Sequence, residues 1–360
     1  MQTVKKLANR WFVVAMGGMA MGLFATLIAG TIMEQIANLL PAGGFTRLLT
    51  EAAKIAKFLM GAGIGAGVAY ALKADKLTMF AAIVAGTIGA IANGLLEEGK
   101  TLSFAIGNPI GAYLAALFAV EVCLLLAGKT KLDLLVLPLS SLIIAVLVAW
   151  LLCPPVTWLI RQIALGLFTA VGWNAFVMGI VIAVTMGLIL TLPPSSAAIW
   201  IMICTVIAQG EFTDELAWAS AAAAAGGAAH MVGFAVASFR ENKWGGLVAQ
   251  GLGTSMLQIP NVMKKPVILI PAIAASAVVG PLATTVFQLR GNAVGGGMGT
   301  AGLVGVIQTV AESAGTMSPF KLILGIALLF FIIPAAVAFV VSEILRKYNI
   351  IKPGDMKLDL

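Results

Sequence analysis

Most of this 360-residue chain consists of apolar stretches about as long as a bilayer is thick. Hydrophobic residues make up 61% of it and charged residues 10%, whereas a soluble domain has roughly 25% charged residues. A hydrocarbon core offers the backbone no hydrogen bonds, so a chain that crosses it forms helices or closed barrels. Stretches of about 20 apolar residues are typical of transmembrane helices rather than of the shorter strands of a barrel. The sequence therefore predicts an all-α polytopic membrane protein.

Measured against that length, the chain is expected to form one membrane domain with about ten transmembrane helices. The candidate spans are 12–38, 56–72, 77–96, 109–128, 132–153, 173–192, 212–238, 265–289 and 319–345. Residues 197–209 are too short to span and are expected to form half of a hairpin. Between the two halves, Arg161 and Gln162 interrupt apolar residues of 155–172 that recur at helical spacing. This pattern predicts an amphipathic helix in the membrane interface.

Three apolar segments carry Gly, Pro, Asn and Gln where a plain spanning helix would carry Leu. They are residues 106–113, 251–261 and 291–302. Non-helical backbone at membrane depth persists only where it is buried in protein or lines a wet cavity, and in transporters such breaks mark the solute site. We therefore expect re-entrant hairpins within 244–262 and 291–314, and a protein that binds and transports a solute.

The positive charges indicate the orientation of the chain. The basic residues at its ends are Lys5, Lys6, Arg10, Arg346, Lys347, Lys352 and Lys357. Lys and Arg are enriched on the cytoplasmic side, which places both termini in the cytoplasm of a protein of the inner (cytoplasmic) membrane. The net charge of +7 is spread over short clusters between apolar runs, so no nucleic-acid partner is expected. Trp150, Trp158, Trp173 and Trp200 are expected to be interfacial anchors.

Metal and cofactor chemistry is disfavoured by the residues available. Cys123, Cys153 and Cys204 lie inside apolar segments without the spacing of a disulfide framework or zinc site, and the chain has one histidine. No nucleotide-binding glycine loop with its lysine is present. We expect no metal, no cofactor and no catalytic residue in this chain.

His230, the sole histidine, is the leading candidate for solute binding. It lies well inside the segment 212–238, and a titratable group at that depth is a site hypothesis by default. Its imidazole can donate a hydrogen bond to a solute hydroxyl or accept one from it. The alternative is a histidine that bonds only to a neighbouring helix.

Neutral polar side chains on the broken segments complete the predicted site. They are Asn108, Gln258, Asn261, Asn292 and Thr300. Amides and hydroxyls both donate and accept hydrogen bonds, which suits a polyhydroxylated or zwitterionic solute better than a strongly charged one. The alternative is that these side chains cap the breaks themselves.

Three acidic residues are further candidates. Glu211 follows Gly210 at the end of the short apolar run and borders the expected cavity, unless it belongs to the acidic first turn of the next helix. Glu312 shares a helix face with Gln308, unless it ends that helix. Glu121 lies inside a span, where a carboxylate must face protein or water or be protonated, and it is a solute contact unless it pairs with a Lys or Arg on another helix.

Four short motifs carry a resemblance to a known family. They are Gly107–Tyr113, the break Pro193-Pro194-Ser195-Ser196, Gly253–Asn261 and Gly299-Thr300-Ala301-Gly302. With them, nearly the whole chain resembles the membrane IIC component of the bacterial phosphoenolpyruvate-dependent sugar phosphotransferase system (PTS). The similarity is to its regulator-like branch, also described as toxin regulators.

The resemblance implies a homodimer and an elevator-like movement. A dimerisation or scaffold part with the interfacial linker would comprise 1–172, a mobile transport part 173–345 and a cytoplasmic tail 346–360. In the family a membrane histidine and a hairpin glutamate contact the sugar. His230 matches the former, but 291–302 contains no acidic residue.

The resulting hypothesis is a permease of the IIC type that binds and translocates a small hydroxylated solute, a sugar. The missing glutamate weakens coupled phosphorylation, because a carboxylate would orient or deprotonate the reacting hydroxyl. Phosphorylation would also require separate IIA and IIB proteins. An uncoupled or ion-coupled transporter, and a membrane sensor that binds a solute without moving it, remain as alternatives.

Overall fold

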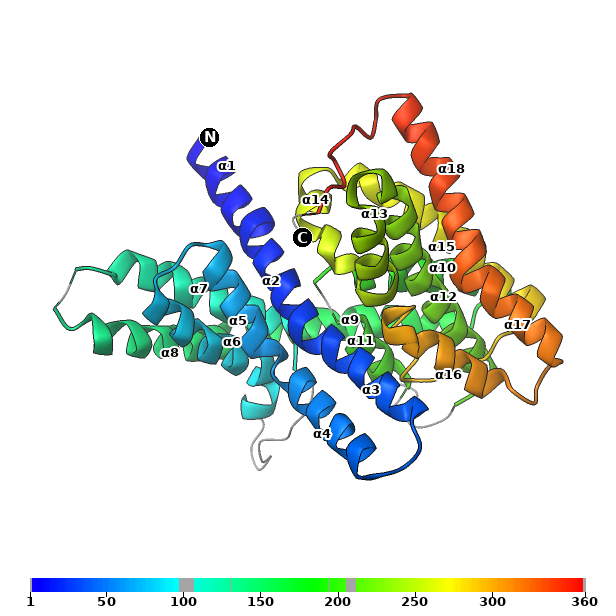
Figure 1. The fold of residues 1–360 in the computed structure, drawn as a ribbon, viewed down its shortest axis with the longest axis horizontal. Helices are drawn as coiled ribbons and strands as arrows, with labels where there is room; N and C mark the ends of the chain where they lie inside the picture. Colours follow the sequence, from blue (N-terminus) through cyan, green and yellow to red (C-terminus); the bar gives the residue numbers. More distant parts are fainter. Residues whose placement is uncertain (1, 97–106, 130, 194, 205–211, 359–360) are drawn as a thin grey trace. The chain divides into compact units, whose positions relative to one another are not determined.

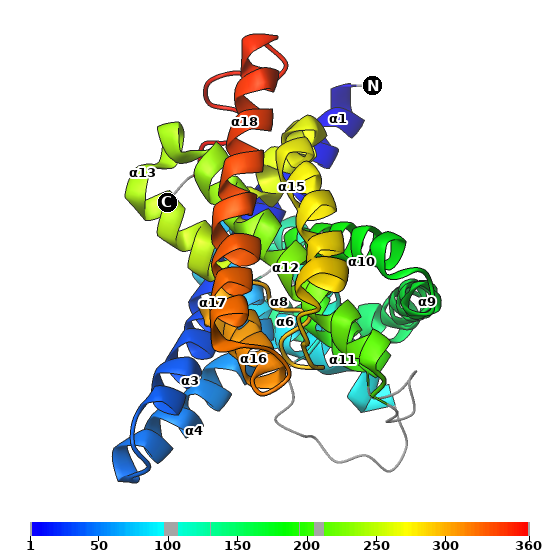
Figure 2. The same cartoon turned by 90° about the vertical axis from the view of Figure 1, so that its right-hand side faces the viewer.

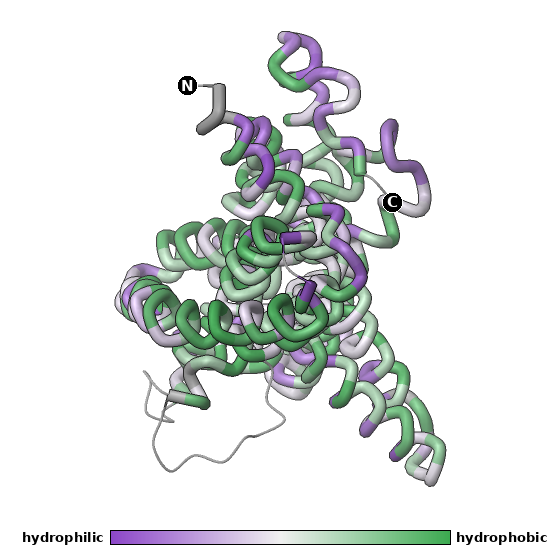
Figure 3. The backbone as a smooth tube through the Cα atoms, turned by 90° about the vertical axis from the view of Figure 1, so that its left-hand side faces the viewer, coloured by the Kyte–Doolittle hydropathy of each residue, from purple (hydrophilic) through white to green (hydrophobic). Residues whose placement is uncertain are grey.

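The computed structural model describes residues 2–96, 107–129, 131–193, 195–204 and 212–358, which are helical apart from turns, extended links and one isolated bridge between Ala314 and Met317. The chain forms two compact units, Met1–Leu159 and Ile160–Leu360 (Figure 1). The helices consist mostly of hydrophobic residues (Figure 3). The prediction of an all-α polytopic membrane protein is confirmed.

The part of the chain that the structure describes contains fewer long apolar helices than the roughly ten crossings predicted. Within the part of the chain that the structure describes, six helices are long and apolar enough to cross a membrane, or seven if one bent pair counts as a span. Two further expected spans are the shorter apolar helices Lys76–Ala92 and Ala175–Thr191. At 17 residues, Ala175–Thr191 reaches about 25 Å at 1.5 Å per residue, less than the roughly 30 Å of a hydrocarbon core, whereas the helix that begins at Lys76 continues to Leu96 and reaches about 31 Å over its 21 residues.

The first unit begins with a single long helical stretch, in which the helix Lys6–Asn38 has 33 residues and carries no charged side chain between Arg10 and Glu34. It comprises α1 (Gln2–Asn9), η1 (Arg10–Ala15), α2 (Met16–Leu23), η2 (Phe24–Ile28) and α3 (Ala29–Leu39). The expected span 56–72 is instead α4 (Gly44–Phe58) bent by 50° against α5 (Met60–Ala71). After it come α6 (Lys76–Leu96), α7 (Pro109–Leu126) and α8 (Asp133–Leu151).

Glycines let the helices of this unit approach closely. A Cβ added to Gly18 would lie 2.2 Å from the carbonyl oxygen of Gly67, and one added to Gly22 would lie 2.0 Å from that of Gly63. The backbones of α2 and α5 are therefore in direct contact. Small residues at such crossings provide van der Waals packing where lipid supplies no hydrophobic driving force.

The predicted amphipathic helix is α9 (Cys153–Val171). Ala164, Leu167 and Val171 are buried on one face, whereas Arg161 and Gln162 are exposed on the other. The three- to four-residue spacing of the buried side chains is that of an amphipathic helix. Its place in the membrane interface stays a prediction.

The second unit is built around α12 (Asp214–Ala237), whose side chains are almost all buried. It packs against α10 (Ala175–Thr191), α15 (Ile270–Pro281) and α18 (Ile333–Lys347), as Figures 1 and 2 show. The remaining elements are α11 (Ser196–Met202), α13 (Phe239–Val248), η4 (Ala249–Gly253), η5 (Ser255–Gln258), α14 (Ile259–Lys264), η6 (Pro266–Leu269), η7 (Leu282–Phe287), η8 (Ala301–Leu303), α16 (Val304–Ser313), α17 (Pro319–Ala327) and η9 (Leu328–Ile332).

The predicted hairpin at 244–262 is present. The chain kinks at Lys243 (φ 51°) within α13, runs through the rest of α13 and η4, becomes extended at Thr254, and continues through η5 and α14. Asn242 before the hairpin and Asn261 near its end both bond to the C-terminal tail, whereas Ser255 between them bonds to Thr191. The segment therefore enters the unit and leaves it at the same end.

The glycine-rich segment follows α12 along its length. The Gly291 N–H donates to Ala217 O at 2.9 Å, the Gly299 backbone contacts Gly227, and Thr300 contacts Met231. Gly299 has φ 54°, a left-handed conformation that glycine adopts without strain. The second half of the predicted hairpin, 304–313, is the regular helix α16.

The prediction of interfacial tryptophans is wrong for Trp200. Trp150, Trp158 and Trp173 are at least half exposed, but Trp200 is fully buried. Its indole N–H donates to Ser220 Oγ at 3.0 Å, and Gly296 leaves room for the ring. The ring fills the space between α11, α12 and the glycine-rich segment, a long-range contact that composition does not reveal.

Gly226→Ala is expected to lower the free energy of unfolding by about 1–3 kcal/mol, the usual cost of overpacking. The added Cβ would lie 2.1 Å from the carbonyl oxygen of Ala183 and force α10 away from α12. Unfolding in mixed micelles titrated with SDS measures the change. Gly166→Ala on α9 is the control, because its added Cβ meets no atom within 4 Å. Equal stability of the two variants would contradict the close α10–α12 contact.

Candidate functional site

A hydrogen-bonded cluster surrounds the predicted histidine. The side chain of His230 is fully buried, and its Nδ1 lies 2.8 Å from Thr191 Oγ1. The same hydroxyl lies 2.9 Å from Ser255 Oγ. These residues come from α12, the last position of α10 and the inner part of the hairpin. The cluster thus joins the central helix to the broken segment that the sequence singles out.

The second ring nitrogen of His230 has no hydrogen-bond partner among the residues that the structure describes. In either tautomer of the neutral ring, Nδ1 satisfies Thr191 and Nε2 is left as a buried donor or a buried acceptor. Such a group costs about 1–3 kcal/mol when unsatisfied. Gly187 lies beside it, since a Cβ there would be 2.9 Å from Nε2. A solute hydroxyl or a water is the kind of partner that would satisfy this atom.

Thr300 brings the glycine-rich segment to the same region. Its hydroxyl donates to Gly251 O on the hairpin at 2.6 Å and lies 3.5 Å from the sulfur of Met231. Met231 is the neighbour of His230 and packs with Leu190 and Ala301. Both broken segments of this unit therefore converge beside His230.

Gln258 and Asn261 belong to a separate network at the open end of the hairpin. Gln258 Nε2 donates to Gln250 Oε1 at 2.8 Å and to Met356 O at 3.0 Å. Asn261 Nδ2 donates to Gln258 Oε1 and to Lys357 O, both at 2.8 Å. The amide donors of both predicted residues are thus engaged by protein.

Asn292 and Glu312 lie together, but far from His230. Asn292 Nδ2 donates to Gln308 Oε1 at 2.8 Å and to Glu312 Oε1 at 3.0 Å. The neighbouring Gly291 bonds to Ala217, which precedes His230 by 13 residues, or about 20 Å of helix. These predicted residues therefore fall into three separate groups, which are His230 with Thr300, Gln258 with Asn261, and Asn292 with Glu312.

The remaining candidates are not brought to His230 by any contact that the structure describes. Asn108 caps α7, its Oδ1 accepting the Ile110 N–H at 3.0 Å, as the alternative interpretation predicts. Glu121 accepts from Arg10 Nε at 2.6 Å and from Trp11 Nε1 at 2.9 Å, which confirms the ion-pair alternative. Glu211 lies outside the described residues.

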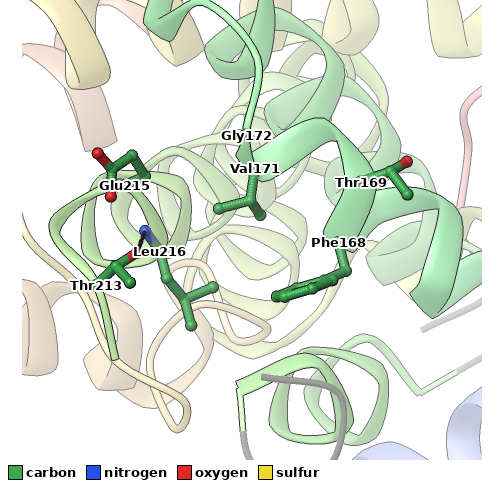
Figure 4. Close-up of a pocket in the computed structure, with 7 residues that line it drawn as sticks. All are labelled: Phe168, Thr169, Val171, Gly172, Thr213, Glu215 and Leu216. Atoms are coloured by element: carbon green, nitrogen blue, oxygen red, sulfur yellow. Dashed lines mark hydrogen bonds between the residues drawn. The ribbon is translucent and has the colours of Figure 1, made fainter. Parts of the chain in front are cut away.

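An open cleft of about 510 Å³ was not predicted from the sequence. It lies between the end of α9 and the start of α12 (Figure 4). Its lining residues are Phe168, Thr169, Val171, Gly172, Thr213, Glu215 and Leu216. Leu216 precedes His230 by 14 residues, or about 21 Å of helix. Thr213 caps α12 and receives the Leu216 N–H at 3.3 Å, so its oxygen already serves the fold.

Two members of the cluster, Thr191 and Ser255, were missed by sequence reasoning. Thr191 directly precedes the break at Leu192-Pro193, and Ser255 lies within a broken segment. Their positions next to backbone breaks were the available signal. Within the described ranges, no group of three or more His, Cys, Asp or Glu side chains could hold a metal ion.

Comparison with known proteins adds one finding. The sequence model of the family described as "Phosphotransferase system, EIIC" matches residues 13–358. No curated protein and no solved structure matches the chain.

Thr191→Val is expected to lower the free energy of unfolding by about 1–3 kcal/mol, because it removes the buried partner of both His230 and Ser255. Thr191→Ser is the matched control, since it keeps the hydroxyl. SDS titration in mixed micelles measures both variants. If the valine variant were as stable as the serine variant, the hydroxyl would not hold the cluster together.

Proposed function

The chain belongs to the EIIC family of the phosphotransferase system, and from this we propose that it carries a small hydroxylated solute, a sugar, across the membrane. An EIIC domain is a multi-pass transporter that works with a phosphotransferase partner. The open questions are where this chain holds the solute, how it moves it, and whether phosphorylation accompanies the movement.

We assign the solute to the cluster of His230, Thr191 and Ser255, beside Thr300. The observation that carries this assignment is the buried Nε2 of His230 without a partner at the meeting point of two broken segments. Hydroxyls and a neutral imidazole each donate or accept, as the hydroxyls of a sugar do. No charged side chain bonds to this cluster among the described residues, which disfavours a strongly charged solute.

The other predicted ligands enter the proposal in lesser roles. Gln258 and Asn261 would reach a solute only after giving up bonds to the tail. Asn292 and Glu312 would meet it at the level of Ala217, on a path toward His230. Asn108 and Glu211 remain predictions from their sequence context.

We further propose an elevator-like movement in a homodimer, with Ile160–Leu360 as the transport part. The division of the chain into two units supports this proposal, as does the presence of the His230 cluster and both of its broken segments in one of them. The boundary then lies within α9 rather than after it. Both termini are placed in the cytoplasm by their basic residues.

Transport without phosphorylation is the second candidate, with or without a coupling ion. The segment 291–302 has no acidic residue, and Glu312 is exposed and bonded to Asn292 about 20 Å along α12 from His230. A carboxylate to activate a hydroxyl is thus missing from the described cluster. The same chemistry would suit the regulator-like branch, in which a protein could sense the solute without moving it.

His230→Ala and Ser255→Ala are each expected to weaken solute binding about two- to tenfold, the loss of one hydrogen bond to a neutral group. Titration calorimetry with a panel of hexoses, pentoses and polyols measures the affinity. Ser276→Ala is the matched control, because that buried hydroxyl bonds only within its own helix. Unchanged affinity in both variants would contradict the assignment of the solute to the His230 cluster.

Counterflow in proteoliposomes is expected to show exchange of the bound sugar, which separates a permease from a sensor. Binding without exchange would contradict the permease. Phosphorylated IIB is then added to the same vesicles. Phosphosugar would establish coupling, whereas continued exchange of unmodified sugar would establish the second candidate.

A further inference from the structure

The C-terminal tail, residues 348–358, folds back onto the second unit. It returns from the end of α18 to the neighbourhood of α13 and α14 (Figure 1). Ile351, Met356 and Leu358 are buried, and the first two pack against Phe234 and Val262. The tail is thus a docked part of the fold.

The polar contacts of the tail are made mainly by its backbone. Asn242 Nδ2 donates to Met356 O, and the Leu358 N–H donates to Asn242 Oδ1, both at 2.8 Å. Met356 O also accepts from Gln258, and Lys357 O accepts from Asn261. The side-chain amides of Asn242, Gln258 and Asn261 therefore bond to the backbone of three consecutive tail residues, Met356 to Leu358.

These amides lie at both ends of the hairpin. Asn242 directly precedes the kink at Lys243, where the chain turns inward, and Asn261 lies on the returning arm. The tail therefore bridges the two arms where they meet the surface. One segment, the tail, therefore fixes the distance between the two arms of the hairpin.

Ion pairs reinforce the docking. Asp355 pairs with Lys265 of the returning arm, and the partly buried Glu241 pairs with Arg346 and accepts the Gly354 N–H at 2.9 Å. Partial burial acts to raise the pKa of Asp355, but hydrogen bonds from Lys265 and the Lys352 amide outweigh it and lower that pKa. Asp355 is therefore ionised at neutral pH.

The hairpin that the tail bridges is also the segment that contacts Thr191 and Thr300. Gln258 donates to Gln250, and between these two residues lie Gly251, which accepts from Thr300, and Ser255, which bonds to Thr191. Movement of the hairpin relative to α10 and the glycine-rich segment would separate the contacts of Gly251 and Ser255. The tail restrains that movement from the opposite end of the hairpin.

We propose that the docked C-terminal tail is an intramolecular latch that holds the hairpin 244–261 against the His230 cluster and must undock before the hairpin can move. Its role in admitting solute rests on the proposed function. Its role in restraining the hairpin does not.

Hydrogen exchange measured by mass spectrometry on the detergent-solubilised protein tests the restraint without any solute. Two variants undock the tail: deletion of 352–360, and Asn242→Ala in the full-length chain. Amides of 244–258 are expected to exchange at least about fivefold faster in both, because Asn242 alone supplies two hydrogen bonds. Lys357→Ala is the control, because the exposed side chain is removed and the carbonyl that accepts from Asn261 remains.

Faster exchange confined to the hairpin in both variants, with Lys357→Ala unchanged, would establish the latch. Unchanged exchange in Asn242→Ala would overturn it, even if the truncated chain failed to fold. Exchange that also rose throughout α10 and α15 would overturn it as well, since it would indicate general destabilisation rather than release of one segment.

Counterflow of the sugar that binds the wild type then tests the role in transport. An undocked hairpin is expected to change the exchange rate at least about threefold relative to Lys357→Ala, and an identical rate would overturn gating by the tail. Absence of counterflow in the wild type would instead contradict the proposed function, while hydrogen exchange would still decide whether the tail restrains the hairpin.

Discussion

The second unit depends on the small side chains of α12. Between Ala219 and Ala229 this helix carries Ala, Gly and one Ser, so neighbouring backbone can lie directly on it. The carbonyl of Ala183 on α10 contacts Gly226, and Gly299 of the irregular segment contacts Gly227. Irregular backbone needs such a surface, because its polar groups must be enclosed by protein at membrane depth. The first large side chain after this surface is His230, which explains why so many elements meet there.

Local pattern predicted much of the architecture. Proline and asparagine place the start of α7 at Pro109, and the change from Ala-rich sequence to Lys243-Trp244-Gly245 marks the turn into the hairpin. These features depend on residues close together in the chain, such as caps and breaks. The length of the apolar run was a weaker guide to crossings, since the predicted span 56–72 is divided between the end of α4 and α5 at a 50° bend.

The composition of the site was harder to predict, because it depends on contacts between residues distant in sequence. Asn292 and Asn261 are equally polar and equally close to backbone breaks. Asn292 nevertheless bonds to Gln308 of α16, whereas Asn261 bonds to the C-terminal tail. The sequence around Glu121 does not indicate that Arg10, more than 100 residues away, is its partner. His230 could be identified because it is the only residue of its kind, whereas Thr191 is one hydroxyl among many. The rarity of histidine led to a side chain that lies in a buried hydrogen-bonded cluster, whereas polarity alone did not separate Asn292 from Asn261.

The first helix has a consequence for the lipid around the protein. Its uncharged run Trp11–Met33, of 23 residues, would reach about 35 Å, some 5 Å more than a typical hydrocarbon core. Such a mismatch is accommodated by tilt, by local thickening of the bilayer, or by extension of the helix into the headgroups. Glu34 near its end pairs with Lys57 of α4 at 2.6 Å, a charged contact suited to the headgroup region. The tilt of this helix, and of α5 whose glycines pack on it, should therefore vary with bilayer thickness.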